Sequence, residues 1–262
     1  MSSTCLKVGK GNAHLRDSAG RPSPVRSRRA CLTPTQREVL RPTELVACGS
    51  FACVYDREPG VDADGTSRSA TVVKLTQDET DVAAMQLAGD DPRVVRLKSA
   101  YRLADPVSLL GSKSIYAAVV ERLDRAPTAL RRIFAKVPAS ILATNYDKSP
   151  AAGTEDYVVE GHRRDGIGDI ACGYAKTKAA ARCREVVQEV VDLHERLGRR
   201  GVRLVDIHGG NVGVDRRTGT WKMLDLGYSE SGQPQVPDLA GIRGWPGRVR
   251  GRGRVRWPPS RI

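Results

Sequence analysis

Asp206, Asn211 and Asp225 carry side-chain oxygens within one short stretch of this sequence. Asp206 precedes Asn211 by five residues, and two β-capable runs joined by an Asp- and Gly-containing turn at 215–219 separate Asn211 from Asp225. These runs predict a β-hairpin, which would return Asp225 to the neighbourhood of the other two side chains. Carboxylate and amide oxygens suit a hard cation such as Mg²⁺ that carries nucleotide phosphates. The stretch therefore predicts a site for magnesium and phosphate.

The same residues resemble the catalytic loop and the metal-binding loop of the protein-kinase superfamily, whose motifs read H-R-D-x-x-x-x-N and D-F-G. The resemblance implies that Asp206 orients an acceptor hydroxyl and accepts its proton, while Asn211 and Asp225 hold Mg²⁺. His208 stands where protein Ser/Thr kinases usually place Lys, and it could hydrogen-bond a γ-phosphate. A histidine at this place is similar to the aminoglycoside and other small-molecule kinases, which share the lobe plan and the metal ligands.

Residues 44–55, E-L-V-A-C-G-S-F-A-C-V-Y, predict two strands joined by a turn of small residues. The segment is similar to the family's Gly-rich loop, L-G-x-G-x-F-G-x-V, with alanine in place of both outer glycines. Small side chains let backbone N–H groups approach phosphates, although alanine does not take the positive φ angles open to glycine. A hairpin without a ligand explains the same residues. The resemblance implies nucleotide contacts from Gly49, Ser50, Phe51 and Val54.

Residues 70–75, A-T-V-V-K-L, predict a strand that carries Lys74. A solvated edge charge is one interpretation of this lysine. The other is the family's V-A-I-K element, whose amine holds the α and β phosphates. In that role Lys74 needs an acidic partner from the next helix, which we expect at 76–88 with Thr76 as its N-cap. Glu79 and Asp81 both qualify, and the sequence does not choose between them.

Residues 115–120 predict an apolar strand, and Glu121-Arg122-Leu123 follow it. The pattern resembles the hinge between the two lobes of the family. That resemblance implies that the backbone around Glu121 and Leu123 hydrogen-bonds the adenine edge, with Val120 controlling access behind it. A strand that ends in a charged loop explains the local sequence equally well.

Apolar residues recur at steps of three or four from 179 to 197 and predict an amphipathic helix. His194 lies on the apolar side of this helix, so we expect a packed core residue rather than a ligand. A shorter helix is expected at 129–142 and a loop at 149–169. Residues 228–262 are too few for the A-P-E segment and the late helices that hold peptide substrates in the family, which predicts a shortened C-terminal lobe.

The 262 residues are 40% apolar, enough for a real core, but they contain no run of about 18 apolar residues that would predict a membrane span. The first residues lack the apolar core of a signal peptide. Six cysteines show no C-x-x-C pair and no metal-ligand spacing. These features predict reduced thiols in an intracellular protein, cytoplasmic or, in a eukaryotic cell, nuclear.

The formal net charge of +13 belongs to the ends of the chain. Residues 1–30 hold seven Lys/Arg and one Asp, and residues 241–262 hold seven Arg and no acid. Residues 31–240 are therefore close to neutral. Both ends are poor in hydrophobic periodicity, which predicts a disordered basic N-terminal tail at 1–34 and a disordered Arg/Gly-rich tail at 241–262. Either tail is a candidate contact for a polyanion, nucleic acid included.

Together these features predict an α+β, two-lobed, protein-kinase-like fold, with a small β-rich N-lobe and hinge at 35–123 and a shortened helical C-lobe at 124–240. The resemblance extends from about residue 44 to residue 227, with its elements in the family's order. It implies an ATP- and Mg²⁺-dependent kinase that transfers the γ-phosphate to a Ser/Thr hydroxyl. A small-molecule kinase of the same fold and a pseudokinase that binds nucleotide or a partner are the alternatives. The acceptor is then a protein or a small-molecule hydroxyl.

Overall fold

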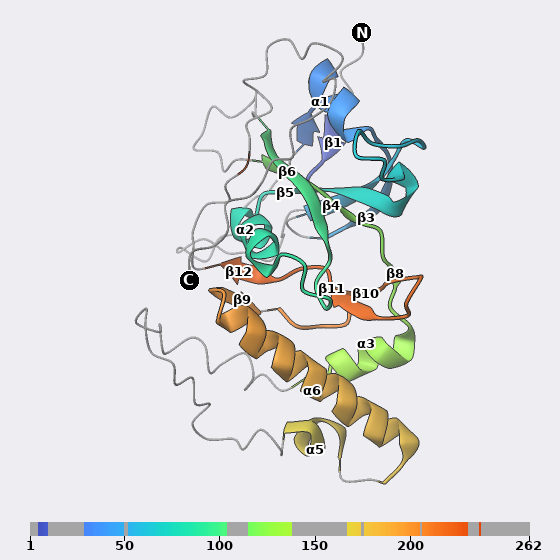
Figure 1. Ribbon diagram of the computed structural model, residues 1–262, viewed down its shortest axis with the longest axis vertical. Coiled ribbons are helices and arrows are strands. Elements are labelled where there is room, and N and C mark those ends of the chain that lie inside the picture. The colour runs from blue at the N-terminus through green and yellow to red at the C-terminus, as the bar shows by residue number, and fades with distance from the viewer. Residues whose placement is uncertain are drawn as a thin grey trace, which may run out of the picture.

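The computed structural model describes residues 5–9, 29–49, 52–103, 115–137, 167–173, 176–204, 206–229 and 236. It combines one five-stranded sheet with smaller strand pairs and a few helices, so the predicted mixture of helices and strands is confirmed (Figure 1). The large sheet occupies one half of the molecule, and the long helix α6 occupies the other. Ser50, Phe51 and the tail at 241–262 lie outside the described residues.

The large sheet is antiparallel and has the order β3-β4-β5-β7-β6. The adjacent inner strands β5 and β7 are almost wholly buried, because both faces of the sheet are covered. Residues rich in Val, Ile, Thr and Ala suit such a position. The strands are β3 (Pro42–Cys48), β4 (Ala52–Arg57), β5 (Thr71–Thr76), β6 (Leu97–Leu103) and β7 (Ile115–Glu121).

Alternation along β5 sends successive side chains to opposite faces. Val73 and Leu75 join the cluster under α1 (Pro34–Leu40), whereas Val72 joins the cluster that reaches α2 and α6. Lys74 stands on the same face as Val72. The strand therefore aims a lysine into the half of the molecule where α6 lies.

Helix α2 (Glu79–Ala88) packs beside the sheet, and two residues separate it from the end of β5. Asp78 caps it by accepting hydrogen bonds from the N–H groups of Thr80 and Asp81. The predicted cap, Thr76, is wrong, because Thr76 is still paired with Tyr116 in the sheet. Asp is among the best N-cap residues, so the helix begins where its cap can act.

The prediction of a disordered segment at 1–34 is wrong for its two ends. Strand β1 (Cys5–Lys7) pairs with β2 (Arg29–Cys31), and the following Val8 is fully buried. Tyr55 donates its hydroxyl hydrogen to the carbonyl of Lys7 at 2.9 Å. Strands of three residues are too short to produce a readable period, so only packing on the sheet reveals them.

The prediction of reduced thiols is also wrong, because all six cysteines are paired: Cys5–Cys31, Cys48–Cys53 and Cys172–Cys183. The first two bridges join residues that face each other across antiparallel strands. The third joins α5 (Ile167–Cys172) to α6. Sequence spacing reveals none of these contacts, since each depends on strand register or helix packing. Disulfides are typical of oxidising compartments, so the cysteines no longer support an intracellular location.

The second half of the molecule is built on α6 (Lys178–Gly198), which matches the predicted helix within a residue at each end. Helix α3 (Thr128–Phe134) is shorter than the predicted 129–142, and α5 begins inside the predicted loop 149–169. The predicted hairpin is confirmed, since β10 and β11 pair antiparallel. The strands are β8 (Asp124–Arg125), β9 (Val202–Leu204), β10 (Val212–Val214), β11 (Trp221–Met223) and β12 (Gly227–Ser229). None of the helices in the described residues is long and apolar enough to cross a membrane.

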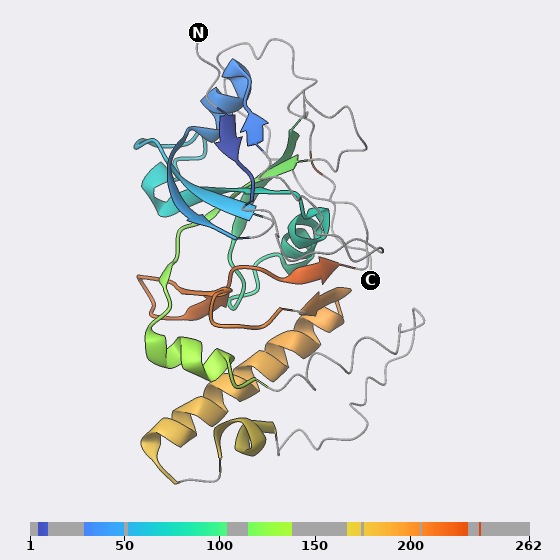
Figure 2. The same cartoon turned by 180° about the vertical axis from the view of Figure 1, so that it is seen from behind.

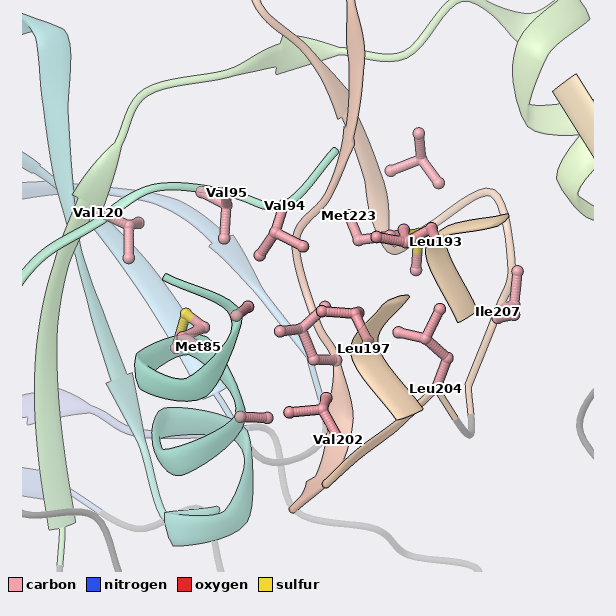
Figure 3. Close-up of a cluster of buried hydrophobic side chains, with 14 of the residues drawn as sticks. Met85, Val94, Val95, Val120, Leu193, Leu197, Val202, Leu204, Ile207 and Met223 are labelled. Atoms are coloured by element: carbon pink, nitrogen blue, oxygen red, sulfur yellow. The ribbon is translucent and has the colours of Figure 1, made fainter. Parts of the chain in front are cut away.

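One hydrophobic cluster joins the two halves. Met85 of α2, Val94 and Val95 meet Leu193 and Leu197 of α6, together with residues of β9 to β11 (Figure 3). Figure 2 shows α2 and β12 side by side from behind, as in Figure 1. His194 is buried on the apolar side of α6, as predicted, and burial lowers its pKa. The site between the halves thus rests on a continuous core.

An ion pair reinforces this junction. Arg196 of α6 donates to both carboxylate oxygens of Asp91, at 3.0 and 3.3 Å, and the side chain of Asp91 is 2% exposed. Burial raises the pKa of Asp91, but the hydrogen bonds from Arg196 and from the N–H of Arg93 outweigh it and hold the pKa below its usual value. The carboxylate therefore favours the folded chain.

Substituting Asp91→Asn should lower the free energy of unfolding by about 2 kcal/mol, the usual scale for a hydrogen bond to a charged group. Because the folded pKa of Asp91 is depressed, its contribution is present above about pH 4 and is lost as pH falls through the folded pKa. Urea unfolding of wild type and variant should thus converge in acid. The control, Asp90→Asn, removes an 85%-exposed neighbour and should cost almost nothing. Equal costs for both variants would contradict the ion pair.

Candidate functional site

Lys74 forms the centre of the candidate site. Its ammonium nitrogen lies 2.6 Å from Asp81 Oδ2 and 3.7 Å from Asp225 Oδ2, and it donates to the carbonyl of Leu224 at 3.3 Å. The residue is only 6% exposed. The interpretation of Lys74 as a solvated edge charge is therefore wrong. The charge is buried and shared by β5, α2 and the segment after β11.

Asp81, and not Glu79, is the partner of Lys74. Asp81 is 1% exposed and stands on the inner side of α2. Glu79 instead accepts a hydrogen bond from the hydroxyl of Tyr116 at 3.2 Å. Two residues along a helix turn the side chain by more than half a revolution, so the two carboxylates cannot both reach Lys74. The tertiary structure thus settles the alternative that the sequence left open.

Electrostatics keep Lys74 cationic. Burial lowers the pKa of Lys74, but the carboxylates of Asp81 and Asp225 outweigh burial and raise it above its usual value. Burial raises the pKa of Asp81 to about 7, because the ammonium of Lys74 opposes that rise only in part. An isolated buried charge is expensive, so each group requires the other. A permanently cationic lysine next to a carboxylate is what phosphate binding beside a metal needs.

Asp81 also holds the segment that carries Asp225. The N–H of Leu226 donates to Asp81 Oδ1 at 3.3 Å, and the Asp225 side chain is 37% exposed beside Lys74. The N–H of Leu224 donates to the carbonyl of Asn211 at 2.8 Å. The hairpin therefore returns Asp225 to Asn211, as the sequence predicts.

The catalytic loop predicted at 206–211 is held by its own side chains. Asn211 Nδ2 donates to the carbonyl of Asp206 at 2.9 Å and to its Oδ2 at 3.2 Å. His208 Nδ1 accepts from the N–H of Gly210 at 2.9 Å, which leaves the hydrogen of a neutral ring on Nε2. That nitrogen lies 3.3 Å from Asp206 Oδ2. Both side chains thus orient the same carboxylate oxygen of Asp206.

Gly209 is required by packing. A Cβ at this position would lie 2.6 Å from the carbonyl oxygen of Arg131 and 2.7 Å from its Cβ. The backbone of the loop therefore rests directly on α3. A Cβ on Gly210 would collide with the His208 ring at 2.6 Å. The two glycines allow both the helix contact and the position of the imidazole.

The donor set fits magnesium. Mg²⁺ usually takes one or two carboxylates from the protein and completes its shell with water and phosphate oxygens. Asp225 offers a partly exposed carboxylate, and Asn211 uses its Nδ2 on Asp206, which leaves Oδ1 for a cation. The described ranges contain no group of three or more His, Cys, Asp or Glu side chains that could hold a metal ion, so the fit rests on Asp225 and Asn211 with water and phosphate oxygens completing the shell.

Two further predicted nucleotide contacts come from the Gly49 hairpin and from the β7–β8 connection. The N–H of Gly49 donates to the carbonyl oxygen of Ala52 at 2.8 Å. Among the described residues, a Cβ added to Gly49 would meet only that oxygen, at 3.7 Å. Among the described residues, no contact requires glycine at this position. Val54 packs against the cluster that contains Val120, and so lies on the same face of the sheet as Lys74.

Glu121 does not direct its carboxylate toward a ligand. Its Oε1 accepts from the N–H of Arg96 at 2.7 Å and from Lys222 Nζ at 2.5 Å, and its own N–H donates to Arg96 O at 3.0 Å. Leu123 packs against Gly213 so closely that a Cβ added to Gly213 would lie 2.7 Å from the Cβ of Leu123. The sequence did not predict that Lys222 pairs with Glu121. Its only signal is its place on β11, as a charged residue between two buried ones.

No family model and no curated protein sequence matches this chain. Among solved structures, "Crystal structure of Rad53 1-466 in complex with AMP-PNP" aligns with 18% identity and a TM-score of 0.35. The alignment covers 72% of this chain and 38% of that chain, so this chain spans well under half the length of that protein. Backbone agreement at this level carries no argument about function.

Replacing Asp81 by Leu should cost about 3–5 kcal/mol of unfolding free energy, because it leaves the ammonium of Lys74 without its nearest partner. The double variant Lys74→Met/Asp81→Leu should cost clearly less, since no buried charge then remains. Urea unfolding measures both. Glu79→Gln serves as the matched control on the same helix and should change stability by less than about 1 kcal/mol. A control as costly as Asp81→Leu would show that the ion pair is misassigned.

Gly209→Ala should destabilise the chain by about 1–3 kcal/mol, the scale of overpacking, because the new methyl group meets the backbone of α3. Gly198→Ala is the control, since a Cβ there has nothing within 4 Å. In that C-terminal turn of α6, alanine should be neutral or slightly stabilising. Thermal unfolding of the two variants distinguishes the positions, and an unaffected Gly209→Ala protein would refute the contact with Arg131.

Proposed function

We propose that this chain is an ATP- and Mg²⁺-dependent phosphotransferase with a two-lobed, protein-kinase-like fold. The observation that carries the proposal is the buried ammonium of Lys74 between Asp81 and Asp225, with the Asn211–Asp206 pair on the adjoining strand connection. Phosphoryl transfer depends on alignment and charge neutralisation more than on covalent catalysis, and these residues supply both. In this proposal the half with the large sheet corresponds to the N-lobe and the half with α6 to a shortened C-lobe.

The proposed roles are those that the kinase resemblance implies. Lys74 would hold the phosphates, while Asp225 and Asn211 would hold Mg²⁺, which would supply charge neutralisation for the transferred phosphoryl group. The Gly49 hairpin and Val54 cover the nucleotide, and the backbone near Glu121 and Leu123 meets the adenine edge. Because the N–H of Glu121 already donates to Arg96, that donor is not available to adenine.

Asp206 is the proposed base for the acceptor hydroxyl. Its Oδ2 accepts a hydrogen bond from Asn211 and lies 3.3 Å from His208 Nε2, so Oδ1 is the oxygen proposed to take the hydroxyl proton. The carboxyl side chain of Asp206 is 66% exposed, which leaves room for an acceptor. A Ser/Thr hydroxyl of a protein is the first choice.

A small-molecule hydroxyl is the second choice of acceptor, and His208 favours it. The imidazole is engaged with Asp206 and Gly210, whereas the lysine of protein Ser/Thr kinases is a cation at this place. A kinase of aminoglycoside type would use the same base and metal ligands. Use of ATP favours an intracellular location. The three disulfides favour an oxidising compartment instead.

ADP release with ATP and Mg²⁺ tests the proposal, with a generic protein acceptor in one series and aminoglycosides in another. Asp206→Asn should lower kcat by about 10²–10⁴-fold, the usual contribution of a general base. Asp225→Ala should abolish turnover and the thermal stabilisation by ATP–Mg²⁺. The surface variant Glu185→Gln is the control.

The acceptor that supports turnover identifies the class of kinase. Stabilisation by ATP–Mg²⁺ that Asp225→Ala removes, without turnover on any acceptor, would indicate a pseudokinase. Absence of both turnover and stabilisation would refute the nucleotide site itself.

A further inference from the structure

Five cations gather around α3 and the neighbouring β-hairpin. We call them the basic face: Arg125, Arg131, Arg132, Lys136 and Arg217. Arg131 is partly buried and the other four are exposed. Residues 31–240 as a whole are close to neutral, so this is a local concentration of charge rather than a sample of the average. The segment 122–136 alone holds five cations and one carboxylate.

None of these five cations has a carboxylate within 4 Å in the part of the chain that the structure describes. Neighbouring cations do have one, since Arg122 pairs with Asp56 at 2.5 Å and Arg216 with Asp124 at 3.5 Å. The buried ammonium of Lys74 is also paired, with Asp81. Like charges on one helix face repel, and among the described residues Arg217 alone of the five has a carboxylate, that of Asp215, which its charge affects from beyond ion-pair distance. The basic face is therefore suited to an external anion.

The basic face draws its residues from three neighbouring elements. Strand β8 pairs with β10, with Arg125 opposite Gly213, and the turn after β10 carries Arg217. Figures 1 and 2 both show α3 beside this small sheet. Helix α3 turns Leu130, Ile133 and Phe134 to the core, which leaves Arg132 and Lys136 on its outer side.

The basic face adjoins the catalytic loop. The backbone of Arg131 lies against Gly209, three residues after Asp206. Helix α3 therefore lies beside the loop that carries Asp206. The nucleotide phosphates already have Lys74 in the proposed function, so they do not need these cations. The charges are placed for the acceptor.

We propose that the basic face binds an acidic peptide segment of the acceptor and so brings a neighbouring hydroxyl to Asp206. The inference rests on the proposed phosphotransfer and specifies its substrate class. Complementary charge gives recognition and fast association more than raw affinity. A peptide of alternating acidic residues can contact cations on a helix and on a turn at once, while a Ser or Thr within it reaches the loop.

The test compares two peptides of equal length, one with Ser flanked by Glu and Asp, the other with Ser flanked by Gln and Ala. The variant Arg131→Ala/Arg132→Ala/Lys136→Ala removes three charges and keeps the Cβ of Arg131 that touches the Gly209 backbone. The control Lys176→Ala/Lys178→Ala/Arg182→Ala removes three exposed cations near the start of α6. The basic ends of the chain are the same in all proteins. Thermal unfolding checks that the wild type and both triple variants are folded. The single substitution Arg132→Glu, at an exposed residue, repeats the test.

Wild type should prefer the acidic peptide by about tenfold in KM, equivalent to about 1.4 kcal/mol, and salt should reduce this preference. The basic-face variant should lose the preference and the control should keep it. Anisotropy of a labelled acidic peptide, without ATP, measures binding independently of turnover and should show the same loss.

Other outcomes are equally decisive. Turnover with equal KM for both peptides would overturn the acidic-acceptor inference and leave the phosphotransferase intact. Peptide binding that depends on the basic face, without turnover on any acceptor, would overturn phosphotransfer and leave an acidic-peptide site. Tighter binding of a DNA oligonucleotide of equal charge, with the same dependence on the three cations, would replace the peptide by a polynucleotide.

Discussion

The buried ammonium of Lys74 is the constraint on which the arrangement of the other elements depends. A charge enclosed by protein costs several kcal/mol unless carboxylates and carbonyls surround it. Its ligands come from α2 through Asp81 and from the chain after β11 through Asp225 and the carbonyl of Leu224. Three elements distant in sequence must therefore meet at one atom.

The junction between the two halves supports this meeting point from outside. An apolar cluster shared by α2 and α6 fills the space, and the pair of Asp91 with Arg196 closes one edge. At another edge Arg93 lies over the Trp221 ring, 4.6 Å from its centre, and Trp221 and Arg93 both donate to Glu189 of α6. Glu121 and Lys222 join the β7–β8 connection to β11. The strand that leads to Asp225 is thus held from both sides.

In the loop 206–211, small residues and one histidine fix the backbone and one carboxylate oxygen. Gly209 lets the loop rest on α3, and Gly210 supplies the N–H that orients His208 toward Asp206. The same contact with α3 brings the basic face next to this loop. Positioning of the base and recognition of an acidic acceptor would then have a common structural origin. In that arrangement the acceptor, rather than the nucleotide, meets the unusual features of this chain.

The sequence by itself determined the elements whose evidence is local. Apolar periodicity predicted α6 within a residue at each end, and turn residues between β-capable runs predicted the β10–β11 hairpin that returns Asp225 to Asn211. Motif order predicted which lysine would belong to the site. These features depend on neighbours within about a dozen residues, and such patterns are readable in one dimension.

Only the tertiary structure decided between Asp81 and Glu79, because the choice depends on which side of α2 faces β5. The same holds for the cysteine pairs and for the strands β1 and β2, which exist through register and through packing on a sheet that lies elsewhere in the chain. Contacts between distant segments follow from docking geometry, and residue spacing does not encode that geometry directly.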